Sequence, residues 1–276
     1  MTPSSFARLL EQCRLDLACG LSLLTRLPAG WLAPPAYRSG TRPWPLARSI
    51  WCWPFIATLI GAFTGGVLAA LRLGHVPALA AAGLALACQT VLTGGLHEDG
   101  LADMADGFGG TTTERRLAIM RDSHVGSYGV MALGLSLLVR ASALAALPVW
   151  ADIGTCAVTA CLARMAMLLV PRLSRPARPD GLARVLYPLP PYSLPGAALV
   201  TVGVLSGLSA MMHTGVEPSP WAYLTFMGAP IGISCATALL LVFCAKHLLG
   251  GFTGDVIGCC AVVTECLLLS FYAALA

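Results

Sequence analysis

The sequence predicts an all-α integral membrane protein, a polytopic bundle of about seven transmembrane helices with an N-terminal interfacial amphipathic helix. Its composition indicates a membrane protein, because 57% of the residues are hydrophobic and only 11% are charged, against roughly 25% charged in an average soluble domain. Long apolar runs recur along the chain, each near the roughly 20 residues that cross a hydrocarbon core of about 30 Å. Because no water solvates the backbone there, such runs should be helices. We expect residues 1–276 to form one membrane-embedded domain.

Residues 1–48 are expected to form an interfacial helix and a basic connection. One helical stripe of this segment is apolar and consists of Phe6, Leu9, Leu10, Cys13, Leu17, Leu21 and Leu24. Arg8, Glu11, Arg14 and Asp16 lie off this stripe, which favours a helix lying in the membrane interface over a spanning one. Pro28 should end the helix, and further prolines break the connection that follows it.

Seven uncharged or nearly uncharged runs follow and are the predicted spans. They are Ser49–Leu71, Ala78–Leu96, Tyr128–Leu147, Ile153–Val170, Leu194–Met212, Trp221–Ala245 and Val256–Ala276. Most of the 11 cysteines lie within or beside these runs, so we expect buried thiols that act as small apolar side chains.

The distribution of Arg and Lys predicts the orientation of the bundle. Basic residues precede the first run and fill the connections after the second, fourth and sixth runs, whereas the remaining connections, near Arg72, Asp152 and Glu217, hold a single Arg. Short cytoplasmic loops carry an excess of Lys and Arg. The N-terminus and the three basic connections are therefore expected in the cytoplasm and the C-terminus on the far side.

Residues 97–127 form a carboxylate-rich cytoplasmic loop that we expect to be catalytic. It contains six of the 13 acidic residues of the chain: Glu98, Asp99, Asp103, Asp106, Glu114 and Asp122. If the second span continues as a helix into the cytoplasm, Asp99, Asp103 and Asp106 lie within about 60° of one another. Such an acidic stripe with all-oxygen ligands favours Mg²⁺ or Mn²⁺, and the alternative is a solvated, acidic helix end.

Arginines follow this stripe closely. Thr111–Glu114 has the form of a capping box that opens a short helix carrying Arg115, Arg116 and Arg121. Guanidinium groups beside a carboxylate and metal site suit a diphosphate. For any one of these arginines, anchoring by the positive-inside rule is an equally good explanation.

Three ionisable residues lie inside predicted spans. Arg164 and Glu265 are costly in hydrocarbon and should face the bundle interior or a wet cavity, and we expect them to pair with each other. Arg140 has a weaker claim to a functional role than Arg164, because it could be a structural ion-pair partner or could extend to the membrane surface. The segment Gly250–Asp255 is a glycine-rich turn at the start of the last span, where backbone N–H groups could approach a phosphate.

The segment Gly94–Gly110, together with Glu114–Arg116 and Met120–Gly129, closely resembles the signature of the cobalamin synthase family, the adenosylcobinamide-GDP ribazoletransferases. The resemblance extends to Leu23–Pro28, Ala177–Ala183, Gly250–Asp255 and Thr264–Glu265, and so spans nearly the whole chain. Met104, where Thr is expected, and Cys259–Cys260, where small residues are usual, depart from the family pattern without touching a proposed ligand.

The resemblance implies a Mg²⁺-dependent, multi-pass enzyme of the bacterial inner membrane with its active site facing the cytoplasm. It would join adenosylcobinamide-GDP to α-ribazole, or to α-ribazole 5'-phosphate, and yield adenosylcobalamin or its phosphate plus GMP. Such phosphoryl transfer depends mainly on positioning and charge neutralisation.

The resemblance also implies roles for individual residues. Asp99, Asp103 and Asp106 would bind the metal ion, and His97, Asp122, His124 and Glu265 would be catalytic residues. His97 or His124 would take the hydroxyl proton, as one stripe carboxylate also could. Arg115, Arg116, Arg164, Arg178, Thr253 and Asp255 would contact the substrates. No nucleic-acid partner is expected.

Two other functions compete. The Asp-Gly-x2-Asp-x2-Asp spacing is distantly similar to the aspartate motif of the CDP-alcohol phosphotransferases, which would indicate a lipid-alcohol enzyme, by analogy alone. A divalent-cation or proton-coupled transporter would place acidic residues near the bilayer midplane on several helices, often in repeated halves. Only Glu265 meets that description, and the chain has no evident internal repeat.

Overall fold

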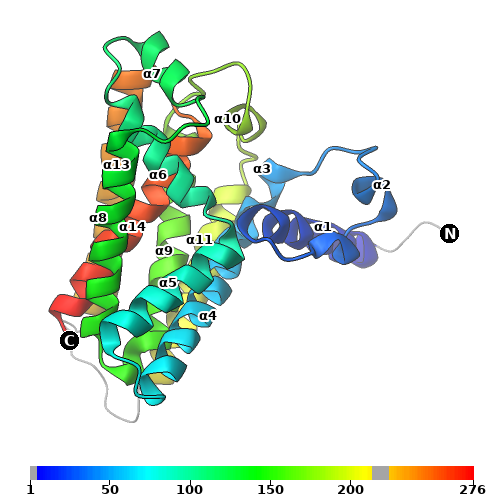
Figure 1. The fold of residues 1–276 in the computed structure, drawn as a ribbon. Coiled ribbons are helices and arrows are strands. Elements are labelled where there is room, and N and C mark those ends of the chain that lie inside the picture. The colour runs from blue at the N-terminus through cyan, green and yellow to red at the C-terminus, as the bar shows by residue number, and fades with distance from the viewer. Residues whose placement is uncertain (1–4, 213–223) are drawn as a thin grey trace.

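The structure, a computed structural model, describes residues 5–212 and 224–276 and consists of packed helices (Figure 1). Its long helices are α4 (Trp53–Leu73), α5 (Ala78–Thr93), α8 (Ser127–Ala146), α9 (Asp152–Leu173), α11 (Ser193–Met212), α13 (Ala229–Leu249) and α14 (Gly254–Ala274). Within the described residues, β-type pairing is limited to one isolated bridge between Pro176 and Phe252. The predicted all-α membrane fold is therefore confirmed.

Within the described residues, five helical segments are long and apolar enough to cross a membrane: Leu46–Leu73, Ser127–Ala146, Val149–Leu173, Ala229–Leu249 and Gly254–Ala274. A sixth span results if α5 and α6 (Leu96–Gly107) count as one broken span, and Ser193–Leu208 is a shorter apolar helix. The predicted number of seven spans thus stays a prediction. The predicted loop at Glu217 and the first residues of the predicted span Trp221–Ala245 lie outside the described residues.

The second predicted span does not continue as one helix, and this part of the sequence interpretation was wrong. α5 ends at Thr93, and α6 leaves it at an angle of 95°. Gly94 and Gly95 both have left-handed backbone angles, with φ of +73° and +68°, a conformation that glycine adopts at little cost. The Arg26 guanidinium packs so closely on Gly94 that a Cβ atom there would overlap it. The acidic residues 99–106 therefore lie on a separate helix.

Helix α1 (Ser5–Leu24) extends sideways from the bundle (Figure 1). Leu9 and Leu10 are 56% and 54% exposed, while Leu24 is buried against the bundle, as an interfacial helix with one attached end requires. Asp16 is also buried. Its carboxylate is satisfied there by two hydrogen bonds, one from the Arg48 Nε atom (2.7 Å) and one from the Trp51 Nε1 atom (3.0 Å). The turns that connect α1 to α4 are η1 (Ala29–Leu32), α2 (Pro35–Arg38), α3 (Leu46–Ser49) and η2 (Ile50–Cys52).

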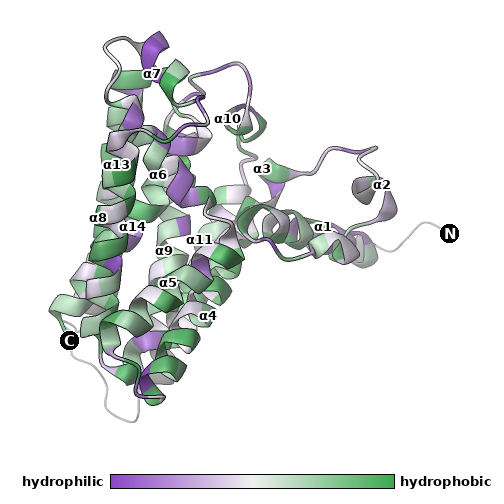
Figure 2. Ribbon diagram, viewed as in Figure 1, coloured by the Kyte–Doolittle hydropathy of each residue, from purple (hydrophilic) through white to green (hydrophobic). Residues whose placement is uncertain are grey.

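Helix α9 is the central helix of the bundle and packs most extensively against α4. Gly61 and Gly65 of α4 allow this approach, since Cβ atoms there would overlap backbone atoms of Cys156 and Asp152. All 11 cysteines are free thiols; six of them are buried, as expected, whereas Cys88 and Cys235 are exposed. Apolar residues cover the long helices, and hydrophilic residues concentrate near α7 (Thr113–Ile119) and α10 (Leu182–Val185) (Figure 2).

The two ends of the bundle differ in their ion pairs. At the end away from α7, the Arg72 Nη1 atom lies 2.9 Å from the Asp152 Oδ1 atom, and the Asp152 side chain is fully buried. The single Arg predicted on this side is thus a structural partner of Asp152. α14 begins near α10 and runs to the C-terminus at the opposite end from α7 (Figure 1).

Candidate functional site

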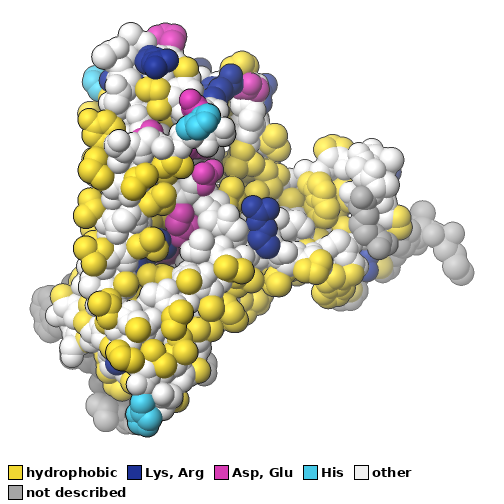
Figure 3. Space-filling model, in the orientation of Figure 1, with side chains coloured by type: hydrophobic (Ala, Val, Ile, Leu, Met, Phe, Trp, Pro, Cys, Tyr) yellow, Lys and Arg dark blue, Asp and Glu magenta, His cyan; other side chains and the backbone are white. Residues whose placement is uncertain are grey.

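A cavity of about 310 Å³ lies where α1, α4, α6, α9 and α14 meet the segment of residues 178–186. Five residues singled out in the sequence line it: His97, Asp99, Arg178, Thr253 and Asp255. Apolar side chains complete the wall, among them Trp53 and Met167. On the face shown in Figure 3, acidic side chains gather in the region of α6 and apolar side chains cover the lower part.

The floor of this cavity is fixed by close packing between α6 and α14. Gly100 and Gly258 face each other, so that a Cβ atom at Gly100 would lie 2.8 Å from the Asp255 carbonyl oxygen. The absence of side chains lets the two backbones approach. Asp99 of α6 and Asp255 of α14 consequently line one cavity, although they are far apart in the sequence.

Gly100→Ala should therefore lower turnover strongly. The added methyl group must push α6 away from α14, and a displacement of about 1 Å at an active site can cost roughly a hundredfold in rate. The measurement is turnover per folded molecule, with folding checked by thermal unfolding in detergent. Gly134→Ala on α8 is the matched control, because nothing lies within 4 Å of a Cβ atom there. Wild-type turnover in Gly100→Ala would contradict this role of the helix contact.

The carboxylates near the cavity repel one another. Asp103 is half-buried and lies within electrostatic range of Asp255, Asp99 and Asp106. No ion pair joins Asp99, Asp103 or Asp255 to a basic residue within the described part of the chain. Arg178 is the basic residue that acts on both Asp103 and Asp255, and a group with this excess of carboxylates is expected to attract a further cation.

Asp106 has a structural role that the sequence analysis did not predict. Its Oδ2 atom accepts a hydrogen bond from the Gly126 backbone N–H (2.7 Å) and its Oδ1 atom one from that of Gly129 (2.9 Å). These groups belong to the first turn of α8, so Asp106 caps this helix from outside. Both glycines are needed, because a Cβ atom on either would overlap the Asp106 carboxylate. Metal binding by Asp106 stays a prediction.

The donor set fits Mg²⁺ only in part. Within the described residues, no three His, Cys, Asp or Glu side chains are arranged to hold a metal ion. Mg²⁺ is, however, usually bound through one or two carboxylates, with water and substrate phosphates as the other ligands. Asp99 and Asp255 at the cavity, with Asp103 close by, can supply these oxygens.

Arg178 faces the carboxylates from the segment before α10. Its Nη2 atom donates to the Leu117 carbonyl oxygen (2.7 Å), and its Nε atom is buried without a hydrogen-bond partner. Burial lowers the pKa of this guanidinium, against the opposing effect of Asp255, but an arginine remains charged. A buried N–H group without a partner is costly, and because Arg178 also lines the cavity, a phosphate there would lie beside its guanidinium group.

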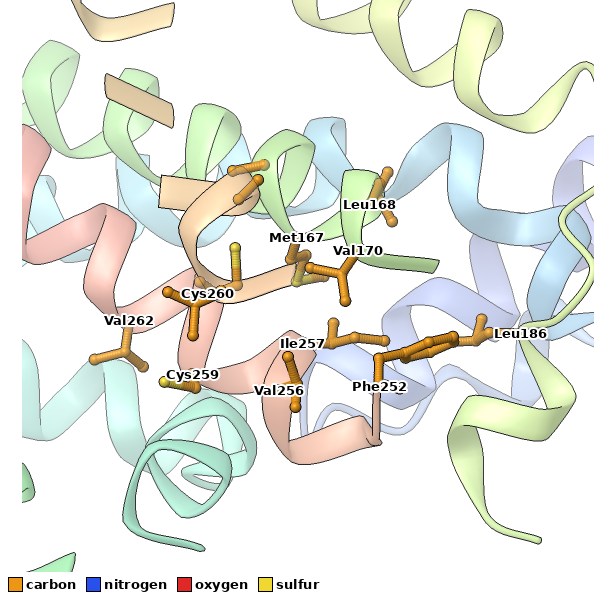
Figure 4. Close-up of a cluster of buried hydrophobic side chains, with 14 of the residues drawn as sticks. Met167, Leu168, Val170, Leu186, Phe252, Val256, Ile257, Cys259, Cys260 and Val262 are labelled. Atoms are coloured by element: carbon orange, nitrogen blue, oxygen red, sulfur yellow. The ribbon is translucent and has the colours of Figure 1, made fainter. Parts of the chain in front are cut away.

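Thr253 joins the cavity through the start of α14. It is the N-cap residue, and its Oγ1 atom accepts from the Val256 N–H (3.4 Å) and donates to Asp255 (3.1 Å). The adjoining turn is held to the segment after α9, because the Phe252 N–H donates to the Arg175 carbonyl oxygen (2.9 Å). Phe252 itself is fully buried beside Leu186 (Figure 4). This turn therefore holds Asp255 firmly at the cavity.

Two predicted substrate-binding arginines, Arg115 and Arg116, lie on α7 and do not line the cavity. The Thr112 Oγ1 atom caps this helix by accepting from the Arg115 N–H (3.2 Å), so α7 begins one residue later than the predicted capping box. The Arg115 side chain is exposed, and the Arg116 Nη1 atom donates to the Leu248 carbonyl oxygen (3.4 Å). Their contact with substrate stays a prediction.

Asp122 and His124 also lie away from the cavity, on the exposed connection between α7 and α8. The His124 Nδ1 atom and backbone N–H lie 2.6 and 3.0 Å from the Asp122 Oδ1 atom. These hydrogen bonds lower the pKa of the Asp122 carboxyl. Their catalytic roles stay predictions, because the pair forms a local turn and has no contact with the cavity residues.

A buried ionic network lies behind the cavity. Glu265 of α14 pairs with Arg164 of α9, as expected, and also with Arg140 of α8, whose Nη1 atom lies 3.3 Å from Glu265 and 2.9 Å from Glu98. The Arg164 Nη2 atom lies 3.3 Å from the His97 Nδ1 atom. His97 is thus the one member of the network that reaches the cavity wall.

Sequence reasoning underrated Arg140 and missed Glu98 and Asp180. Because a charge inside a span is costly, Arg140 could have been expected to need an acidic partner. Glu98, at the start of α6, is one such partner in the structure. Asp180 lines the cavity and accepts from the Arg121 Nη2 atom (2.6 Å), which joins the segment after α9 to α7. Asp180 lies two residues after Arg178 in the sequence, and this proximity to a predicted site residue could have identified it.

A family model described as cobalamin-5-phosphate synthase matches residues 16–273. An adenosylcobinamide-GDP ribazoletransferase of Bradyrhizobium diazoefficiens is 39% identical over 264 residues, which cover 94% of this chain and 93% of the relative. Similar proteins with the same name from Rhizobium etli and Rhizobium meliloti are 35% and 36% identical, over 92% and 91% of this chain and 96% and 92% of the relatives. No solved structure matches the chain. The sequence match therefore covers the cavity, the acidic helix and the buried network together, and the chain belongs to the cobalamin-5-phosphate synthase family.

Proposed function

We propose that this protein is an adenosylcobinamide-GDP ribazoletransferase, which joins adenosylcobinamide-GDP to α-ribazole, or to α-ribazole 5'-phosphate, and releases GMP. Membership of the family, with relatives that bear this name, carries the proposal. It favours this activity over a lipid-alcohol phosphotransferase and over a transporter. The cavity supports it, because two carboxylates, Asp99 and Asp255, and the guanidinium of Arg178 line one space.

The reaction breaks the phosphoanhydride bond of the GDP moiety and forms a new phosphoester bond to α-ribazole. The ribazole hydroxyl oxygen attacks the phosphorus atom that bears cobinamide, the bond from this phosphorus to the oxygen of GMP breaks, and the hydroxyl proton passes to a base. Arg178 would hold a phosphate oxygen through its guanidinium group, and Thr253 and Asp255 would position the diphosphate beside it. His97, which lines the cavity, would take the proton. Orientation and charge neutralisation then supply most of the rate enhancement.

The cofactor in this proposal is Mg²⁺, bound by Asp99 and Asp103 with Asp255 as an additional oxygen donor. Bound there, Mg²⁺ would neutralise negative charge on the diphosphate. Asp106, the third ligand predicted from the sequence, shares its oxygens with the first turn of α8.

The test uses purified protein with adenosylcobinamide-GDP, α-ribazole and Mg²⁺. We expect GMP to form in proportion to cobalamin, with α-ribazole 5'-phosphate compared as the acceptor in a parallel reaction. Chelation of Mg²⁺ by EDTA should stop GMP formation, and added Mg²⁺ should restore it. No GMP with either acceptor, despite folded protein, would refute the proposed activity.

We further propose that the cavity faces the cytoplasm of a bacterial cell and that the protein resides in the inner membrane. The cavity lies at the start of α14, a helix of 21 residues, which is about 30 Å long. The C-terminus should therefore emerge on the far side. An alkaline phosphatase fused after Ala276 should be active, and a green fluorescent protein fused there should be dark. The reverse pattern would contradict this orientation.

A further inference from the structure

A second cavity, of about 420 Å³, lies where α9 and α13 end. It is lined by Arg172, Leu173, Ser174, Arg175, Tyr187, Lys246 and Gly250. None of these residues lines the first cavity. Leu186 lines the first cavity and its neighbour in the chain, Tyr187, lines the second, so the two cavities lie near each other without sharing a lining residue.

The charge of this second cavity is entirely positive. Arg172, Arg175 and Lys246 come from three places in the fold: the last turn of α9, the segment after it, and the last turn of α13. The lining contains no acidic residue. Among the described residues, no carboxylate pairs with any of the three cations. All three cations are exposed, so together they give this hollow a positive potential that favours an anion over a cation.

General effects account for only part of this arrangement. The positive-inside rule and the helix dipole both favour cations in the last turns of α9 and α13, where Arg172 and Lys246 lie. Arg175 lies beyond the helix, and neither effect requires the three side chains to share one hollow. The polar groups of Ser174 and Tyr187 also line this hollow.

We propose that this second cavity is a binding site for a phosphate group, held by Arg172, Arg175 and Lys246. Two guanidinium groups and an ammonium group can bind several oxygens at once, so a phosphate is a better ligand for them than a carboxylate, which has fewer oxygens. Two sources share this chemistry. One is the headgroup of an anionic phospholipid, since basic pockets at the cytoplasmic ends of spanning helices suit lipid phosphates. The other is a soluble phosphate or phosphoester.

The test exploits the fact that Lys246 is the sole lysine of the chain. A bound phosphate would hold its amine in the charged form and shield it, and would thereby slow acylation by an amine-reactive ester. The full chain is reconstituted in nanodiscs of phosphatidylcholine alone, of phosphatidylcholine with phosphatidylglycerol, and of phosphatidylcholine with added inorganic phosphate. Acylation of Lys246 is followed by peptide mass spectrometry, with the terminal amine as an internal reference.

We expect acylation to slow by about tenfold when the phosphate-bearing ligand is present at ten times its dissociation constant. Protection by phosphatidylglycerol alone identifies a lipid site, and protection by inorganic phosphate identifies a site for a soluble phosphate. Arg172→Gln/Arg175→Gln should abolish the protection. Arg42→Gln/Arg184→Gln removes the same charge outside the cavity and should preserve it. Absence of protection in both arms, or equal protection in both double variants, would overturn the proposal.

Discussion

Asp99→Asn and Asp103→Asn should each reduce turnover to less than about a tenth of the wild-type value at saturating Mg²⁺. Each substitution removes one negative charge beside the cavity, and a charge that binds the metal ion contributes several kcal/mol to transition-state stabilisation. Neither side chain holds the fold together through an ion pair within the described residues. The yield of folded protein after detergent extraction should therefore remain close to wild type. The measurement is GMP release per folded molecule.

Two further variants complete this experiment. Glu114→Gln, an exposed carboxylate on α7, is the matched control and should keep full turnover. Asp106→Asn should instead lower thermal stability by about 1–2 kcal/mol, as the loss of a helix cap does, because an amide nitrogen would face one of two backbone N–H groups. Substantial residual turnover in Asp99→Asn or Asp103→Asn would remove that residue from the metal site.

Glu265→Gln should destabilise the protein more than any other single charge removal in the bundle. Glu265 faces both Arg140 and Arg164, and the removal of one partner from a buried ion pair costs about 3–5 kcal/mol, because the remaining charge stays buried. We also expect lower turnover per folded molecule, since Arg164 contacts His97, which lines the cavity. Thermal unfolding in detergent and single-turnover rates measure the two effects separately.

Asp152→Asn is the matched control for this prediction. Asp152 is a buried carboxylate paired with Arg72 at the opposite end of the bundle. Its replacement should lower stability in the same way and leave turnover per folded molecule unchanged. If Glu265→Gln behaves like Asp152→Asn in both measurements, the network only supports helix packing and does not position His97.

Much of this protein could be predicted from local patterns. Apolar length and charge distribution identify the membrane helices, and the capping role of threonine predicts the start of α7 to within one residue. The cost of burying a charge predicted that Glu265 would pair with Arg164, and this was confirmed. These properties depend on residues close in sequence, or on the rule that a buried charge needs a partner.

The direction of the helix that carries the acidic residues was beyond such reasoning. Regular helical spacing places Asp99, Asp103 and Asp106 on one face, and all three do lie on the single helix α6, but the spacing does not predict how α6 is oriented relative to α5. The 95° bend at Gly94–Gly95 arises where Arg26 packs against this turn, and Arg26 belongs to the segment after α1. The turn thus combines two glycines in left-handed conformations with a contact from a distant segment, and local spacing predicts neither.

The sequence by itself determined that this is a helical membrane protein, which end carries its charges, and that residues 97–127 hold its acidic group. The tertiary structure decided which of these residues share a cavity. It brought Asp255 beside Asp99 through the contact of Gly100 with α14, and it turned Asp106 towards the first turn of α8. The physical reason is that hydropathy and charge act along the chain, whereas the partner of each polar group depends on which helices pack together.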